Sequence, residues 1–129
     1  MWSFVGTKRV QRWVWAALDA ETRQVVALVI GDRSADTARD LWDALPDEYR
    51  DGAIVGTDAW AAYAAVVPTP RHAVGDKADG ITNHIERFWW TVRQMCGRFV
   101  RKTLSFSKCD RNHLGALWDF VRRYNACRQ

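Results

Sequence analysis

Residues 12–30, RWVWAALDAETRQVVALVI, decide the fold expected for this chain. Two runs rich in Val, Ile and Trp, residues 12–18 and 24–30, flank the turn-forming stretch DAET, which is the composition of two β strands joined by a turn. Residues 2–6 form a third run of this kind, and the turn-forming TKR separates it from the second run. The three runs predict a meander of antiparallel strands.

Helices and single strands are expected beyond residue 30. Ser34 is suited to cap the first helix, and Pro46 ends it. The stretch PDEYRDG after it is expected to be a loop, and AIVG, residues 53–56, has the apolar character of a strand buried in a sheet. The predicted elements are a helix over residues 35–45, a strand over 53–56, a helix over 59–67, a strand over 71–74, and helices over 81–99 and 110–124.

The two C-terminal helices are expected to be amphipathic. Apolar residues recur at intervals of three and four along each helix, which is the period of a buried helical face. In the first of the two, Glu86 lies beside this stripe. The stripe residues are Ile81, Ile85, Phe88, Val92, Met95 and Phe99 in the first helix, and Leu114, Leu117, Trp118 and Val121 in the second.

This order of elements predicts an α/β domain with a ribonuclease H-like mixed sheet: three antiparallel strands, a helix, a parallel strand, a helix and a strand, followed by C-terminal helices. In such sheets, sites form at the carboxyl ends of parallel strands. Asp58 directly follows the strand expected over residues 53–56. We therefore expect Asp58 at a functional edge of the sheet.

Basic residues concentrate in the C-terminal third. Residues 86–129 contain 10 Lys and Arg against 3 acids, whereas residues 1–85 contain 9 against 12. A local basic surface of this kind is typical of a nucleic-acid-binding face. The alternative is a pair of amphipathic helices with solvated arginines, and charge by itself does not separate the two.

Length and composition predict a single compact domain. The 129 residues are 48% hydrophobic, enough for a core without disulfides or a structural metal. The three cysteines form no C-x-x-C pair and are expected to be reduced and structural. No apolar run approaches the roughly 20 residues of a membrane span, and the N-terminus lacks the features of a signal peptide. We expect a cytoplasmic protein without membrane association.

Asp58 and Glu86 have the chemistry of metal ligands. Phosphoryl transfer on a nucleic acid is served by Mg²⁺, with Mn²⁺ as a possible substitute, and these ions are held by carboxylates. Arg93 follows Glu86 by two helical turns on nearly the same face, where a guanidinium can clamp a phosphate. Taken singly, each of the two acids is more often a turn or solvated helix residue. The cations expected to extend a DNA-contacting track are Arg98, Arg101, Lys102 and Lys108.

Four stretches of the chain resemble the transposases of the insertion sequence 1 family. They are TDAWAAY (57–63), NHIERFWWTVRQ (83–94), RKTLSFSK (101–108) and W-x-F-x-x-x-Y-N (118–125). The stretch WSFVGTKRVQRWVW (2–15) fits the first two strands of that family, so the resemblance covers nearly the whole chain.

The resemblance implies a D-D-E catalytic core. In such a core, two aspartates on strands and one glutamate on a helix bind Mg²⁺, cleave DNA at the ends of the element and direct the freed 3′-hydroxyl into target DNA. Asp58 matches the second aspartate, Glu86 the glutamate and Arg93 the basic residue that follows it. It further implies DNA as partner (terminal repeats and target), a homo-oligomer on DNA, and a bacterial or archaeal protein associated with the nucleoid.

The first strand departs from the family pattern. Members begin it with Asp-Glu-x-Trp; Trp2 matches the Trp, so the first catalytic aspartate falls two positions before Met1. Asp19 and Asp32 follow the second and third strands and are no replacement. The family's zinc-binding and helix-turn-helix segment also precedes this region. We expect residues 1–129 to be one N-terminally truncated catalytic core with impaired catalysis.

Two other functions stay open. A non-catalytic DNA-binding or dimerising fragment that inhibits full-length transposase is suggested by the intact basic half beside the incomplete triad. A general nuclease of the same fold is less consistent with the RKTLSFSK stretch.

The histidines and tryptophans have plainer interpretations. His84 and His113 are expected to be helix-surface or partly buried residues more than phosphate contacts. Three tryptophans are assigned to the core, and three others are candidates for stacking on unpaired bases, although packing is expected for at least one of them. The core set is Trp13, Trp15 and Trp42, and the stacking set is Trp60, Trp89 and Trp90.

Overall fold

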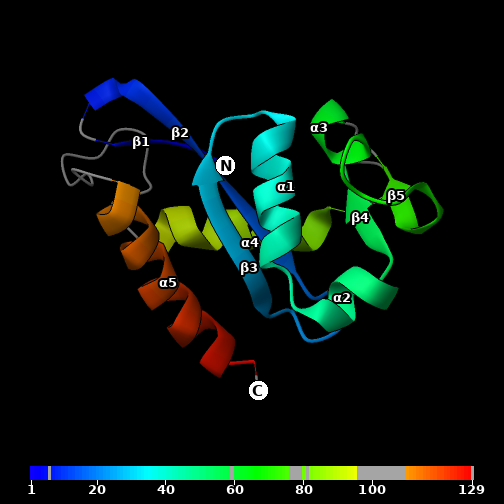
Figure 1. Cartoon of the computed structure of the whole chain (residues 1–129). Helices are drawn as coiled ribbons and strands as arrows, with labels where there is room; N and C mark the ends of the chain where they lie inside the picture. The colour runs from blue at the N-terminus through cyan, green and yellow to red at the C-terminus, as the bar shows by residue number, and fades with distance from the viewer. Residues whose placement is uncertain (6, 59, 76–79, 81, 96–109, 129) are drawn as a thin grey trace.

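The computed structural model describes residues 1–5, 7–58, 60–75, 80, 82–95 and 110–128 (Figure 1). Strands and helices alternate much as the sequence predicts. In chain order the elements are β1 (Trp2–Val5), β2 (Thr7–Leu18), β3 (Val25–Gly31), α1 (Ala35–Ala44), α2 (Asp47–Gly52), β4 (Val55–Thr57), α3 (Ala61–Ala64), the 3₁₀ turn η1 (Thr69–Arg71), β5 (His72–Val74), α4 (Asn83–Met95) and α5 (Asp110–Ala126).

The strands form two sheets. The predicted meander is confirmed: β1, β2 and β3 pair in that order, antiparallel throughout, with Trp2 opposite Trp13 and Trp15 opposite Val29. The strands β4 and β5 pair in parallel, with Val55 opposite His72. The mixed α/β character is therefore confirmed. The single mixed sheet expected from the sequence is not seen in the described part of the chain, because β4 pairs with β5 and with no strand of the first sheet.

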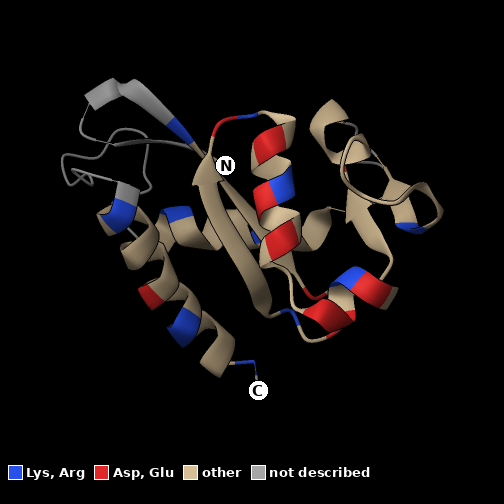
Figure 2. Ribbon diagram, in the orientation of Figure 1, with Lys and Arg blue, Asp and Glu red and all other residues tan. Residues whose placement is uncertain are grey.

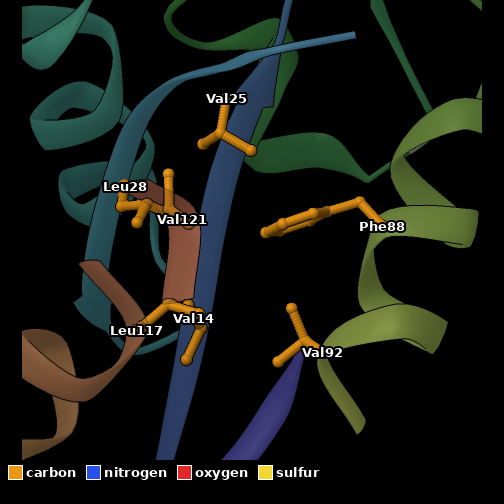
Figure 3. Packing of buried hydrophobic residues seen from close by; sticks show 7 residues of the cluster. All are labelled: Val14, Val25, Leu28, Phe88, Val92, Leu117 and Val121. Carbon is orange, nitrogen blue, oxygen red and sulfur yellow. The ribbon is translucent and has the colours of Figure 1, made fainter. Parts of the chain in front are cut away.

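The middle strand β2 and the edge strand β3 separate two hydrophobic cores. Successive side chains of a strand point to opposite faces, so Val14 and Trp15 enter different cores. On one face α1 packs through Leu41 over Trp15 and Ala27. On the other face lie α4 and α5, and Figure 3 shows their residues closing over the sheet. The buried residues of that second core are Val14, Val25, Leu28, Phe88, Val92, Leu117 and Val121.

The predicted helical stripes are largely confirmed for the residues that the structure describes, and Ile81 and Phe99 lie outside them. Phe88 and Val92 of α4 are completely buried, as are Leu117 and Val121 of α5. Met95 is an exception, because its side chain is 73% exposed at the end of α4. The tryptophans assigned to the core also pack there: Trp15 is buried, and Trp13 and Trp42 lie against the α1 core.

Three local predictions are wrong. Residues 47–52 form the short helix α2 and no loop, because acids occupy its first turn and Arg50 pairs with Asp47. The helix expected over 59–67 is reduced to the single turn of α3. The buried strand expected over 53–56 is observed as β4 over Val55–Thr57, and Ile54 lies just before it with its side chain 78% exposed.

The C-terminal helix is tied to the edge strand β3 by one amide. The Asn125 side chain accepts from Val25 N at 2.9 Å and donates to Val25 O at 3.0 Å, as a neighbouring strand would. The adjacent Tyr124 meets the Phe88 ring edge-on at 5.1 Å. These contacts explain why Tyr124 and Asn125 are suited to the end of α5: they attach the helix to β3 and to Phe88. None of the described helices has the length and apolar character needed to cross a membrane.

We expect Asn125→Ala to lower the free energy of unfolding by about 1–3 kcal/mol, because it leaves the Val25 backbone groups without their partner at a half-buried edge. Asn112→Ala, an exposed position on the same helix, is the control and should change stability by less than about 0.5 kcal/mol. Urea denaturation followed by circular dichroism measures both. Equal losses for the two variants would contradict this role of Asn125.

Candidate functional site

Asp58 stands directly after the carboxyl end of β4 and is exposed. Its Oδ1 accepts a hydrogen bond from Trp60 N at 3.0 Å. The preceding Thr57 is buried, and its hydroxyl donates to Asp58 O at 2.8 Å. Because a hydroxyl has one proton, His72 Nε2 is then the donor in its 2.6 Å contact with Thr57 Oγ1. Both strands of the small sheet thus fix the backbone at Asp58.

Glu86 lies in the first turn of α4 and is also exposed. Its Oε1 accepts from Thr82 Oγ1 at 3.1 Å, and a negative charge at this helix end is favoured by the helix dipole. The chain enters the helix through Gly80, whose φ of 70° favours glycine and whose carbonyl accepts from Asn83 N. The start of α4, and with it Glu86, is therefore set by a local turn.

Asp58 and Glu86 line the same cavity. Its volume is about 980 Å³, and its walls come from β2, α1, β4 and the start of α4. Met1 also lines it. In Figure 1, β4 lies on the side of β2 away from β3, so the cavity lies between the two sheets. The two acids selected from the sequence are thus brought to one hollow, from elements 28 residues apart.

Two other acids near strand ends are occupied by structural hydrogen bonds. Asp19 accepts from Tyr49 Oη at 2.6 Å, which lowers the pKa of the carboxyl and raises that of Tyr49 to about 12. Asp32 accepts from the hydroxyls of Ser34 and Thr37 and from Ser34 N, and these bonds lower its pKa to about 2. Both acids hold turns together, in agreement with their rejection as replacements for a first aspartate.

The turn around Asp32 leaves no room for a larger residue at Gly31. A Cβ at Gly31 would stand 2.5 Å from Thr37 Oγ1, the hydroxyl that binds Asp32. Ser34 caps α1 as predicted, because its side chain accepts from Thr37 N at 3.4 Å. The loop from β3 into α1 is consequently well defined where it borders the cavity.

A stacked arginine stands next to Asp58. The guanidinium carbon of Arg33 lies 3.6 Å from the centre of the Trp60 ring and 4.4 Å from that of Trp13. Trp60 Nε1 donates to Arg33 O at 3.1 Å. Burial raises the pKa of Tyr63 to about 12; the charge of Asp58 adds to this shift and that of Arg33 opposes it. Asp58, Arg33 and Tyr63 therefore share one local electrostatic environment.

The other predicted residues occupy different surroundings. Arg93 is half-buried in the last turn of α4 and is not among the residues that line the cavity. Arg98, Arg101, Lys102 and Lys108 lie outside the described residues. His84 lines the cavity, and its pKa is lowered by burial and by the charges of Arg23 and Arg87. His113 is completely buried in α5.

The tryptophan candidates for base stacking also differ from one another. Trp89 packs against Phe88 at 4.8 Å and serves the core. Trp60 is 38% exposed and Trp90 65% exposed. Only Trp60 and Trp89 line the cavity. Of the three candidates, Trp60 is therefore the one that is exposed, lines the cavity and lies two residues from Asp58 in the sequence.

Four acids line the cavity, Asp19, Glu21, Asp58 and Glu86, and Asp19 is engaged by Tyr49 and by its own turn. Mg²⁺ keeps several waters and is often held by one or two protein carboxylates, so the donor set fits this ion. Within the described ranges, no three His, Cys, Asp or Glu residues gather closely enough to hold a metal. Asp58 and Glu86 are the residues of this chain that would hold one.

Sequence reasoning missed four residues that shape this site. Thr82 binds Glu86, His72 binds Thr57 beside Asp58, and Arg33 and Tyr63 share the surroundings of Asp58. Of the four, only Tyr63 belongs to a quoted motif, TDAWAAY (57–63), and no role was assigned to it there. A signal was present for Arg33, because it follows a strand end just as Asp58 does. The other three act through contacts that depend on the folded arrangement.

Sequence comparison identifies the family. The family model for IS1 transposase matches residues 1–125 of the chain. The chain belongs to the IS1 transposase family. The family expected from the sequence motifs is thereby confirmed.

Curated relatives support the same assignment. The insertion element iso-IS1n protein InsB of Shigella dysenteriae is 34% identical over 123 residues, which are 95% of this chain and 90% of the relative. The insertion element IS1 protein InsB of Shigella sonnei is 36% identical over 112 residues, 87% of this chain and 82% of the relative. For the insertion element IS1 4 protein InsB of Escherichia coli K12, also 36% identical, the matched part is 64% of the relative. No solved structure matches the chain.

Acid should remove the contribution of Asp32 to stability. Its pKa falls from 3.8 to about 2 on folding, so its hydrogen bonds stabilise the fold fully above about pH 4 and are lost as the pH falls toward 2. We expect Asp32→Asn to be less stable than the parent at about pH 6, with the difference shrinking toward about pH 2.5. Urea denaturation over this range measures it, with Asp40→Asn on α1 as the control. A difference that stays constant with pH would contradict this.

Proposed function

We propose that this chain is the catalytic core of a DNA transposase with a ribonuclease H-like fold, which cleaves element ends and joins them to target DNA as a homo-oligomer. The observation that carries the proposal is that Asp58 and Glu86 line the same cavity in a chain of the IS1 transposase family. A bound divalent ion would neutralise the phosphate and activate the attacking oxygen. Asp58 and Glu86 would hold that ion on the cavity wall.

The part of β2 that extends beyond its pairing with Met1 and β1 supports a ribonuclease H-like sheet. Val14 N donates to Met1 O at 2.7 Å, and Met1 N donates to Val14 O at 2.6 Å. Backbone groups of alternate residues face the same edge, so Ala16 is the next β2 residue to offer them there. No described strand pairs with Ala16 on this side, and β4 lies across the cavity. One further strand segment between β2 and β4 would join the two sheets.

In a longer form of the chain, a third carboxylate would fit the same register. With Met1 opposite Val14, the residue two positions ahead of Met1 would stand opposite Ala16. Its side chain would share the face of Met1, which packs against the core beneath α4. An aspartate at that position, as in the family pattern, would thus point toward the helix that carries Glu86. This geometry supports the D-D-E assignment.

The distribution of charge supports a DNA-binding face on the C-terminal helices. Figure 2 shows acidic residues gathered on α1 and α2, whereas α5 carries Arg residues together with Asp119, which pairs with Arg123. Of these, Arg111, Arg122 and Arg123 are exposed. Phosphate contacts of this kind position a duplex without reading its sequence.

Cleavage should depend on all three carboxylates. We expect a chain extended by Asp-Glu ahead of Met1 to cut labelled duplexes carrying the terminal repeats that flank the gene, in Mg²⁺ or Mn²⁺. Extension by Asn-Glu, or Asp58→Asn or Glu86→Gln in the Asp-Glu form, should slow cleavage by roughly 100-fold or more, because each removes a metal ligand. The 129-residue chain should show little activity.

The matched control is Asp40→Asn, which removes an exposed acid from α1. It should leave cleavage unchanged. Robust cleavage that survives Asp58→Asn would overturn the site assignment, and cleavage without preference for the repeats would favour a general nuclease.

A second candidate function is DNA binding without catalysis, as an inhibitor of the full-length transposase. The exposed arginines of α5 favour it, because they serve binding whether or not cleavage occurs. This candidate predicts tight binding by the 129-residue chain and no cut product even in the extended form.

Binding should depend steeply on salt in either case. Each phosphate that a cation neutralises contributes about −0.9 to the slope of log affinity against log salt. We expect Arg122→Gln on α5 to reduce the slope by about one such increment. Arg50→Gln on the acidic helix α2 is the control and should leave the slope unchanged. Gel shifts over a salt series test this, and absence of binding at low salt would contradict both candidate functions.

A further inference from the structure

We propose that Arg33, whose guanidinium contacts the rings of Trp13 and Trp60, is a phosphate clamp that holds the DNA backbone beside Asp58. The proposal rests on the DNA-cleaving function proposed above and adds to it a residue outside the carboxylate set. It starts from the contacts of Arg33, whose guanidinium carbon lies over both rings, at 3.6 Å from Trp60 and 4.4 Å from Trp13.

Stacking prepares the guanidinium for a planar anion contact. Contact with aromatic rings leaves the N–H groups of a guanidinium able to donate to two phosphate oxygens. The cation–π contacts also restrict a side chain that would otherwise lose rotamer entropy on binding. Arg33 is therefore ordered before DNA arrives.

Arg33 has no salt-bridge partner among the described residues. The residue is exposed. Its neighbour Asp32 already accepts from Ser34 and Thr37. A cation held in place without an acidic partner is suited to an external anion.

Trp60 places this cation next to the candidate metal ligand. Its backbone N–H donates to Asp58 Oδ1, and its indole N–H donates to Arg33 O. One residue thus joins the two loops, and Arg33, Trp60 and Asp58 all line the same cavity. A phosphate bound to Arg33 would lie close to the bond that an ion at Asp58 would attack.

The test pairs Arg33→Gln with DNA in which single phosphates near the cleavage point are replaced by uncharged methylphosphonates. Wild-type 129-residue chain should lose affinity roughly tenfold or more at one such position, because a charge-assisted contact is removed. Arg33→Gln should bind unmodified DNA more weakly by a similar factor and show no further loss at that position. Arg33→Lys keeps the charge but lacks the two-pronged guanidinium, so its affinity for unmodified DNA should lie between those of wild type and Arg33→Gln.

Arg39→Gln on α1 is the control and should keep the wild-type sensitivity at that phosphate. Thermal melts check that all variants fold. If Arg33→Gln and wild type respond equally at every phosphate, the clamp is overturned, as it is if neither binds DNA. Since binding is the readout, coupling at one phosphate would uphold the clamp even if the Asp-Glu-extended chain cut no DNA, and that absence of cleavage would count against the catalytic proposal alone.

Discussion

The alternation of side chains along β2 is the constraint on which the rest of the structure depends. Val14 and Trp15 point to opposite faces, so each face of one short sheet needs its own cover. Helix α1 supplies one cover, and α4 with α5 supplies the other. The start of α4 is thereby held against the sheet, and Glu86 is delivered to the cavity by the packing of Phe88 two residues later. Core and site are therefore coupled through one helix.

Long-range polar contacts fix the positions of elements along one another, which the hydrophobic cores do not determine. Asn125 pairs with the backbone of Val25 across 100 residues of sequence, and so aligns α5 with the outer strand. On the other side, His72 and Thr57 join β5 to the end of β4. Apolar packing tolerates sliding of a helix along a sheet, whereas a bidentate amide contact does not. These contacts set the register in which the site residues meet.

The sequence predicted the features that depend on local pattern. The hairpin from β2 to β3, the Ser34 cap and the buried positions Phe88 and Leu117 follow from alternation, capping and helical period. Features that depend on distant partners escaped it. The exposure of Ile54 depends on how the small sheet packs, and the hydrogen bond from Trp60 to Arg33 O joins loops 27 residues apart. Asp58 and Glu86 were selected from motifs in the sequence. That both line one cavity could be seen only in the folded structure.

The remaining hydrogen-bonding capacity of each acid separates structural from functional candidates. An ionised carboxylate offers about four acceptor sites. Asp32 accepts three bonds from its own turn, all at Oδ1, and Asp19 accepts one from Tyr49 at Oδ2 and two from backbone amides at Oδ1. Asp58 and Glu86 each accept one bond from the described residues, and that bond orients the group without filling it. Oriented acids with open acceptor sites at a shared cavity are what a hard divalent cation requires, which is why the proposed chemistry is assigned to this pair and not to the acids at the neighbouring strand ends.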